Sequence, residues 1–202
     1  MRRDETRDLV PLLSTYMQVS SVLVHGGEAF VAADAPLVRV HSCCMTSDVF
    51  GSRRCECGPQ LHAAFRQIVD EGAGAVVYMS SHEGRGIGLW AKAVTYLLQD
   101  MGQDTYEANT ALGLPEDSRD FIDAAVVLRA LRPDNPRIRL ATNNPLKVDD
   151  LTRGGIEIVE RVPLVVGFGQ FNLRYMKAKR EKGHEIPEDA LHGGAPKKPE
   201  SR

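Results

Sequence analysis

The sequence predicts a single mixed α/β domain, with a β-rich first third followed by alternating strands and helices. Short apolar segments bounded by glycine, proline and polar residues fill positions 22–41, as expected of strands. From position 59 onward, segments with helical apolar spacing alternate with short continuous apolar runs that are typical of buried strands. The chain of 202 residues is long enough to bury a core of its own.

We expect this domain to span residues 21–185. Residues 1–20 hold one apolar cluster among polar residues and are expected to form an arm, either a frayed helix or a segment that lies on a partner. From residue 186 the chain is rich in Gly, Pro, Lys and Glu, which predicts a disordered tail over 186–202.

The elements follow from local patterns. Three strands are predicted in the first third, at 22–24, 29–32 and 37–41. A further strand at 75–79 is apolar throughout, which indicates burial on both faces, and shorter strands follow at 138–141 and 156–159. Helices are predicted from Pro59 to Gly72 and over 89–101, 121–131, 145–153 and 173–182.

The charge and the apolar runs exclude several classes of protein. With 25 Lys and Arg against 27 Asp and Glu, the net charge is -2, which excludes binding to nucleic acid through bulk positive charge. No apolar run approaches the roughly 18 residues of a membrane helix, and residues 1–8 lack the apolar stretch of a secretory signal. We therefore expect a cytoplasmic protein in a reducing environment, without a membrane or nucleic-acid partner.

All four cysteines lie between positions 43 and 57, a crowding that favours metal binding over disulfides in such a compartment. The spacing Cys44-x10-Cys55-x-Cys57 offers three thiolates to one zinc ion and leaves its fourth position open. Zinc in such a site lowers the pKa of bound water to about 7, which suits hydrolysis.

Other interpretations of the cysteines remain open. A closed structural site would use Cys43 as a fourth ligand, although adjacent residues on an extended segment point to opposite faces. A catalytic dithiol normally has C-x-x-C spacing, which is absent from this cluster. His41 is a further candidate ligand in place of one cysteine.

Two junctions between a strand and a helix are candidate anion sites. Residues 83–88 (EGRGIG) place Arg85 among glycines before a helix, and Lys147 follows the polar segment 142–145. At both places an ordinary turn is the alternative. Residues 116–120 are expected to open the helix over 121–131. A cation at such a helix start, here Arg119, opposes the helix dipole, which suggests a binding role.

The motifs together resemble the GTP cyclohydrolase II family over residues 39–184. The matching segments are 39–42 (RVHS), 44–50 (CMTSDVF), 54–58 (RCECG), 83–89 (EGRGIGL), Tyr96 with Gln99 and Asp100, 104–109, 142–145 (TNNP) and 159–164 (VERVPL). The resemblance implies hydrolysis of GTP to 2,5-diamino-6-ribosylamino-pyrimidinone 5'-phosphate, formate and pyrophosphate, the first committed step toward riboflavin. It also implies a homodimer.

Residue roles follow from the same resemblance. Cys44, Cys55 and Cys57 would hold zinc, and Mg²⁺ would accompany the triphosphate. Tyr96 would assist ring opening, Asp117 would accept a proton, and Arg119 would act on the α-phosphate. The nucleotide-binding positions implied are Arg39, Gln60, Glu83, Arg85, Thr105, Thr142 and Lys147. From its apolar neighbours alone, a core tyrosine with a solvated hydroxyl is the alternative interpretation of Tyr96.

Three departures from the family pattern leave alternatives. Cys43 stands where the family usually has Glu, Ser80 and Ser81 stand where it has an Arg, and the amino-terminal β region is shorter. A relative in secondary metabolism that acts on another purine nucleotide or stops at the formylated pyrimidine is one alternative. A nucleotide-binding relative without turnover is another.

Overall fold

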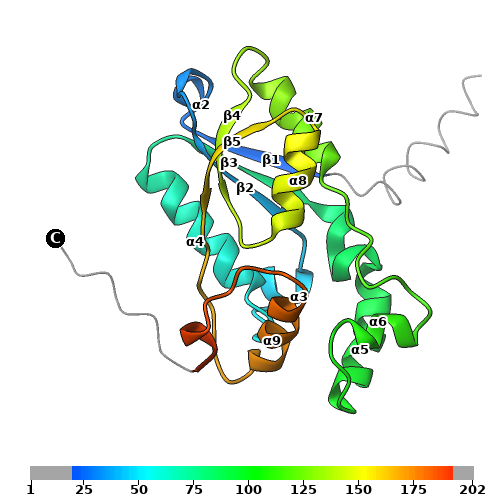
Figure 1. The fold of residues 1–202 in the computed structure, drawn as a ribbon. Coiled ribbons are helices and arrows are strands. Elements are labelled where there is room, and N and C mark those ends of the chain that lie inside the picture. Colours follow the sequence, from blue (N-terminus) through cyan, green and yellow to red (C-terminus); the bar gives the residue numbers. More distant parts are fainter. Residues whose placement is uncertain (1–19, 193–202) are drawn as a thin grey trace, which may run out of the picture.

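A five-stranded sheet in the order β1-β3-β2-β4-β5 forms the centre of the molecule (Figure 1). The computed structural model describes residues 20–192, so the predicted arm, apart from its last residue, lies outside the described residues. The strands are β1 (Ser21–His25), β2 (Leu37–Ser42), β3 (Gly74–Met79), β4 (Arg137–Ala141) and β5 (Glu157–Val162). Strand β1 pairs antiparallel with β3, and all other pairs are parallel. The predicted single α/β domain is confirmed.

Helices cover both faces of the sheet, because alternate side chains of its central strands point to opposite sides. Helix α4 (Cys57–Asp70) lies on one face, and α7 (Ile122–Leu131) and α8 (Pro145–Arg153) lie on the other (Figure 1). On β2, Val38 and Val40 belong to the core under α7 and α8, whereas Leu37 belongs to the core under α4. The arrangement leaves the carboxyl ends of β2, β3 and β4 at one edge of the sheet.

Four helices and a 3-10 turn gather beyond this edge (Figure 1). They are α3 (Met45–Asp48), the 3-10 turn Ser80–Gly86, α5 (Gly88–Asp100), α6 (Glu107–Ala111) and α9 (Leu173–Glu181). In open α/β sheets such an edge is where ligands bind. Within residues 20–192, no helix combines the length and the apolar character needed to cross a membrane.

The predicted strand at 29–32 is wrong, because these residues form helix α2 (Glu28–Ala32). The reason is a contact made from far along the chain. The guanidinium of Arg132 is buried and donates hydrogen bonds to the carbonyls of Phe30, Val31 and Ala33. These carbonyls lie at the end of the helix, where they have no intrahelical partner, and a charged donor satisfies them.

The predicted disordered tail also needs correction for its first residues. Ile186 and Leu191 are buried in a small apolar cluster with Met176 of α9. A tail with little apolar content is still held in place when its two large aliphatic side chains pack together on one helix. The remainder of the tail, residues 193–202, lies outside the described residues.

Candidate active site

The three thiols predicted to bind zinc converge at the carboxyl end of β2. Cys44 lies two residues after the end of β2, while Cys55 precedes α4 and Cys57 begins it. The sulfur atoms of all three lie within 4.8 Å of one another, and the Sγ atoms of Cys44 and Cys55 are 3.6 Å apart. With zinc–sulfur bonds of about 2.3 Å, two thiolates on a tetrahedral ion lie roughly 3.8 Å apart. The cluster therefore has the dimensions of a zinc site.

The three thiols of the cluster differ in how readily they lose a proton. Hydrogen bonds from the Cys55 and Cys57 thiols, together with the charge of Lys92, hold the pKa of Cys44 well below its usual range. The same hydrogen bonds raise the pKa of Cys55 and Cys57, because they donate to the Cys44 thiolate. A divalent cation placed among the sulfurs would stabilise all three as thiolates.

Cys43 lies apart from this cluster. Its thiol donates a hydrogen bond of 3.5 Å to Oε2 of Glu83, and burial raises its pKa to about 11. The neighbouring backbone turns its side chain away from that of Cys44, as expected for adjacent residues of an extended segment. His41 is also occupied elsewhere, because its Nε2 lies 3.1 Å from the Asp48 carboxylate.

Lys92 and Glu83 form a buried ion pair against the thiols. The Nζ atom of Lys92 lies 2.6 Å from Oε1 of Glu83 and 3.1 Å from Sγ of Cys44. The other carboxylate oxygen of Glu83 accepts a hydrogen bond of 2.6 Å from the Met45 amide. Glu83, expected from the resemblance to bind nucleotide, thus has both oxygens engaged beside the cluster.

Sequence reasoning missed Lys92. It stands within a stretch of apolar residues, and the available signal was its position four residues before Tyr96, on the same helical face.

Tyr96 lies on the polar side of α5, beside the thiols. Its hydroxyl is 2.9 Å from Oγ1 of Thr46, and the guanidinium of Arg54 lies 4.8 Å from the ring centroid. The ring lines the cavity that contains the three thiols, which we call the thiol cavity. Burial raises the pKa of Tyr96, so its hydroxyl keeps its proton at neutral pH. The interpretation as a core tyrosine is the weaker one, since the apolar side chains of α5 lie on other faces.

Arg85 is held at the centre of the glycine-rich loop. Its backbone has a φ of +63°, a conformation uncommon outside glycine. Its Nη1 donates to Oγ1 of Thr105 at 2.9 Å, and its guanidinium lies 3.9 Å from the Tyr106 ring centroid. Nη2 is buried without a partner. The loop therefore presents a fixed cation with one unused donor.

A second cavity, which we call the cationic cavity, adjoins the first. It is lined by five cationic side chains and by no carboxylate, namely by Arg39, Arg85, Arg119, Lys147 and Lys179. The predicted binding residues Gln60 and Thr142 also line it. Burial and the neighbouring charges of Arg39, Arg119 and Lys179 hold the pKa of Lys147 well below its usual value. Such a concentration of positive charge favours a polyanionic ligand.

Asp117 and Arg119 form one unit between the cavities. Nε and Nη2 of Arg119 donate to the two oxygens of Asp117, at 2.8 and 2.5 Å. Arg119 lines both cavities, whereas Asp117 lines neither. Although burial alone would raise it, the pKa of Asp117 is lowered by these hydrogen bonds and the adjacent charge.

A second residue missed by sequence reasoning is His82, which directly precedes the EGR motif. It lines the thiol cavity, and its ring packs edge-on against Phe121. Burial and the charges of Arg119 and Lys147 lower its pKa to about 4, so it is neutral at physiological pH.

A family model described as GTP cyclohydrolase II matches residues 14–163 of this sequence. The chain belongs to the GTP cyclohydrolase II family. The resemblance found in the motifs is confirmed.

Curated relatives agree with this membership. The chain is 51% identical over 177 residues to the riboflavin biosynthesis protein RibBA of Mycolicibacterium paratuberculosis, covering 86% of this chain and 41% of that protein. The RibBA of Mycobacterium tuberculosis matches to the same extent. The RibBA of Mycobacteroides abscessus is 53% identical over 151 residues, which are 74% of this chain and 36% of that protein. The cyclohydrolase chain thus spans about two fifths of the length of these relatives.

Proposed function

We propose that this chain hydrolyses GTP to 2,5-diamino-6-ribosylamino-pyrimidinone 5'-phosphate, formate and pyrophosphate, using one zinc ion per chain, within riboflavin biosynthesis. The observation that carries the proposal is the junction of the two cavities. The thiol cavity and the cationic cavity share the walls formed by Ser42, Cys57, Arg85, Arg119 and Tyr175. One nucleotide can therefore present its base to the thiols and its phosphates to the cations.

Zinc held by Cys44, Cys55 and Cys57 would supply a nucleophilic hydroxide at neutral pH. The protonated Tyr96 hydroxyl would donate a proton or a hydrogen bond to the purine ring as its C8–N bonds break. Lys92 contacts both Glu83 and Cys44, and its Nζ atom lies 5.9 Å from the Tyr96 ring centroid. These roles use only groups that line the thiol cavity or contact its walls.

The release of pyrophosphate would take place in the cationic cavity. Arg119, oriented by Asp117, would stabilise charge on the α-phosphate while pyrophosphate leaves. The hydrogen bonds and charge of Arg119 lower the pKa of Asp117 and keep it ionised, which holds the Arg119 guanidinium in place. The role of Asp117 as proton acceptor is what the family resemblance implies. Since no carboxylate lines the cationic cavity, Mg²⁺ would be bound there by phosphate oxygens and water, the ligands it prefers.

One assay tests the whole proposal. Purified protein is incubated with GTP, and formate, pyrophosphate and the pyrimidine are measured together. All three products are expected in equal amounts. Pyrophosphate without formate would indicate that the reaction stops at the formylated pyrimidine, as the Cys43 and Ser80 departures allow. Turnover of another purine nucleotide in place of GTP would contradict the proposed substrate.

Replacing Arg85 by Ala is expected to weaken nucleotide binding by about 2 kcal/mol, roughly 30-fold, because a charge-assisted phosphate contact is lost. Calorimetric titration with a non-hydrolysable GTP analogue measures the effect. Arg66→Ala, on the exposed side of α4, is the matched control and should bind normally. Unchanged affinity in Arg85→Ala would place the phosphates away from this loop.

We further propose that the chain forms a homodimer through α5. This helix exposes a row of apolar side chains, with Trp90 88%, Leu97 64% and Met101 74% exposed, while its polar residues Lys92 and Thr95 are buried. An apolar helix face of this kind on a protein surface marks an interaction site. Figure 1 shows α5 at the periphery, away from the sheet.

Sedimentation equilibrium is expected to give twice the chain mass of 22.2 kDa. Leu97→Asp should reduce it to the mass of one chain, because a charge in an apolar interface is costly. Val126→Asp, at an exposed valine of α7, should leave the mass unchanged. A single-chain mass for the unmodified protein would contradict the proposal.

A further inference from the structure

The segment that follows α9 returns to the edge of the sheet and covers the cationic cavity. Gly183 ends the helix with a φ of +88°, which glycine adopts at little cost. The chain then crosses the β4–α8 loop, where the amide of Glu185 donates a hydrogen bond of 2.9 Å to the carbonyl of Asn143. This contact brings His184 into the wall of the cavity.

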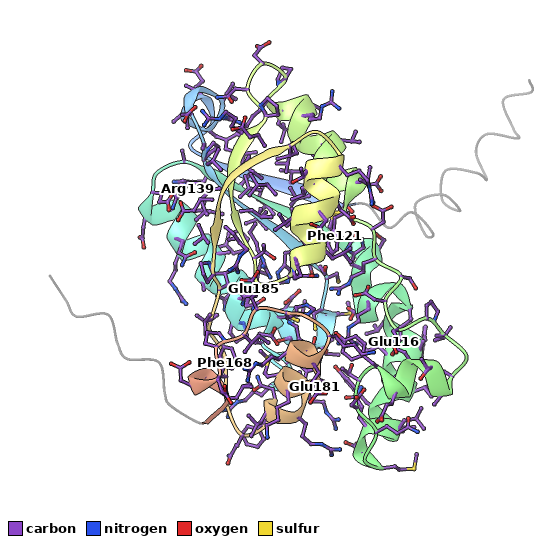
Figure 2. The ribbon with its side chains drawn as sticks, in the orientation of Figure 1. Glu116, Phe121, Arg139, Phe168, Glu181 and Glu185 are labelled. Atoms are coloured by element: carbon purple, nitrogen blue, oxygen red, sulfur yellow. The ribbon has the colours of Figure 1, made fainter. Side chains whose placement is uncertain are left out.

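Contacts on both sides of His184 hold this segment. Glu185 forms an ion pair with Arg161, and Lys182 forms one with Glu116 at 2.6 Å. In the view of Figure 2, Glu185 and Glu116 lie to either side of α9. Ile186 and Leu191 provide the apolar anchor against Met176, and Glu188 pairs with Arg180. A segment held by partly exposed ion pairs and a small apolar cluster opens at lower free energy than the core of the sheet does.

The cavity beneath the segment holds unused hydrogen-bonding capacity. Among residues 20–192, eight buried side-chain polar atoms lack a partner, and four of them belong to residues that line this cavity. All four are nitrogens, namely Arg39 Nε, His41 Nδ1, Arg85 Nη2 and His184 Nδ1. Arg39 Nε and Arg85 Nη2 are buried donors without partners, which is costly, and oxygen atoms of a ligand would satisfy them. His41 Nδ1 is the lone-pair nitrogen of the tautomer that donates from Nε2 to Asp48, whereas His184 Nδ1 is a donor in the tautomer that carries its proton there.

The surroundings of His184 are cationic. Burial and the charges of Lys179, Arg119, Lys147 and Arg85 lower its pKa to about 3. Lys179 itself is paired with the buried carboxylate of Glu56. A neutral imidazole can still donate one N–H to an anion, and it adds no positive charge to the cations around it.

We propose that His184 is an additional phosphate-binding residue and that the segment from Gly183 to Leu191 closes over the polyphosphate chain of the bound nucleotide. The nucleotide is that of the proposed function, on which this inference rests. The segment opens to admit the ligand, and the Glu185 contact to the β4–α8 loop re-forms when phosphate oxygens occupy the cavity. His184 then contributes one donor to the cavity that Arg39 and Arg85 also line.

The test uses inorganic tripolyphosphate as the probe, with GTP turnover measured in parallel. His184→Ala is expected to weaken tripolyphosphate binding on the order of tenfold, as for loss of one hydrogen bond to a charged group. It should leave guanosine binding, zinc content and the midpoint of thermal unfolding unchanged. His62→Ala, at an exposed histidine of α4, is the matched control and should bind tripolyphosphate normally.

Closure is tested by amide hydrogen exchange over residues 183–191. Exchange is expected to slow when tripolyphosphate is added, and Ile186→Asp should abolish that protection by removing the anchor. Unaltered tripolyphosphate binding in His184→Ala would overturn the role of His184, and exchange unaffected by the probe would overturn closure. If GTP is not turned over while tripolyphosphate binding still depends on His184, the proposed function fails and the phosphate site stands.

Discussion

Cys55→Ser is expected to yield a folded protein that contains no zinc and releases no formate from GTP. The Sγ atom of Cys55 lies 3.6 Å from that of Cys44, and all three cluster thiols lie within 4.8 Å of one another. Two thiolates alone bind zinc far less tightly than three, and a serine hydroxyl does not replace a thiolate as a soft ligand. Elemental analysis and a formate assay on the same preparation measure both effects.

Cys43→Ser is the matched control for this prediction. Its thiol lies against Glu83 and outside the cluster, so zinc content should stay at one ion per chain. Formate release in this variant is a separate question, since Cys43 lines the thiol cavity. Full zinc content in Cys55→Ser, or a disulfide between any two cluster cysteines in the native protein, would contradict the proposed site.

Tyr96→Phe is expected to slow formate release on the order of 10² to 10⁴ fold, the usual contribution of one general acid or base. The change removes only the hydroxyl, whose partner in the structure is Thr46 at 2.9 Å. Because the ring stays in place, zinc content and folding should remain normal. A formylated pyrimidine should accumulate where ring opening still occurs but the second hydrolysis fails.

Arg119→Met is expected to separate pyrophosphate release from ring opening and formate release. It removes the cation that Asp117 orients between the cavities, so pyrophosphate release should fail first. Product analysis by mass spectrometry distinguishes the Arg119→Met variant from the Tyr96→Phe variant. If Tyr96→Phe forms the full product and formate at the rate of the unmodified enzyme, its hydroxyl has only a structural role.

Helices long enough to show a repeating apolar pattern were predictable from the sequence. Helices α4, α5 and α7 have 14, 13 and 10 residues, long enough for the apolar period to be evident. Asn144 caps α8 with its side chain, as the segment before Pro145 predicts. Helices α3 and α6, with four and five residues, were not predicted, because one turn carries too little periodicity.

Other features depended on distant contacts. Helix α2 has a strand-like sequence, and Arg132, about one hundred positions away, satisfies its terminal carbonyls. The apolar pattern of α5 suggested a buried face, yet the structure exposes that face and buries Lys92. Local sequence shows that a helix is amphipathic but does not show which of its faces meets the rest of the chain.

By itself, the sequence determined the family, the α/β class and the identity of the thiols, the tyrosine and the cations expected to act. These follow from residue types at short spacing along the chain. Only the tertiary structure decided how they meet: Glu83 beside Lys92 and Cys44, Arg119 on the wall between two cavities, and His184 brought back over the phosphate side. Each of these contacts joins residues from separate elements, and their geometry is set by packing around the sheet, which no local pattern encodes.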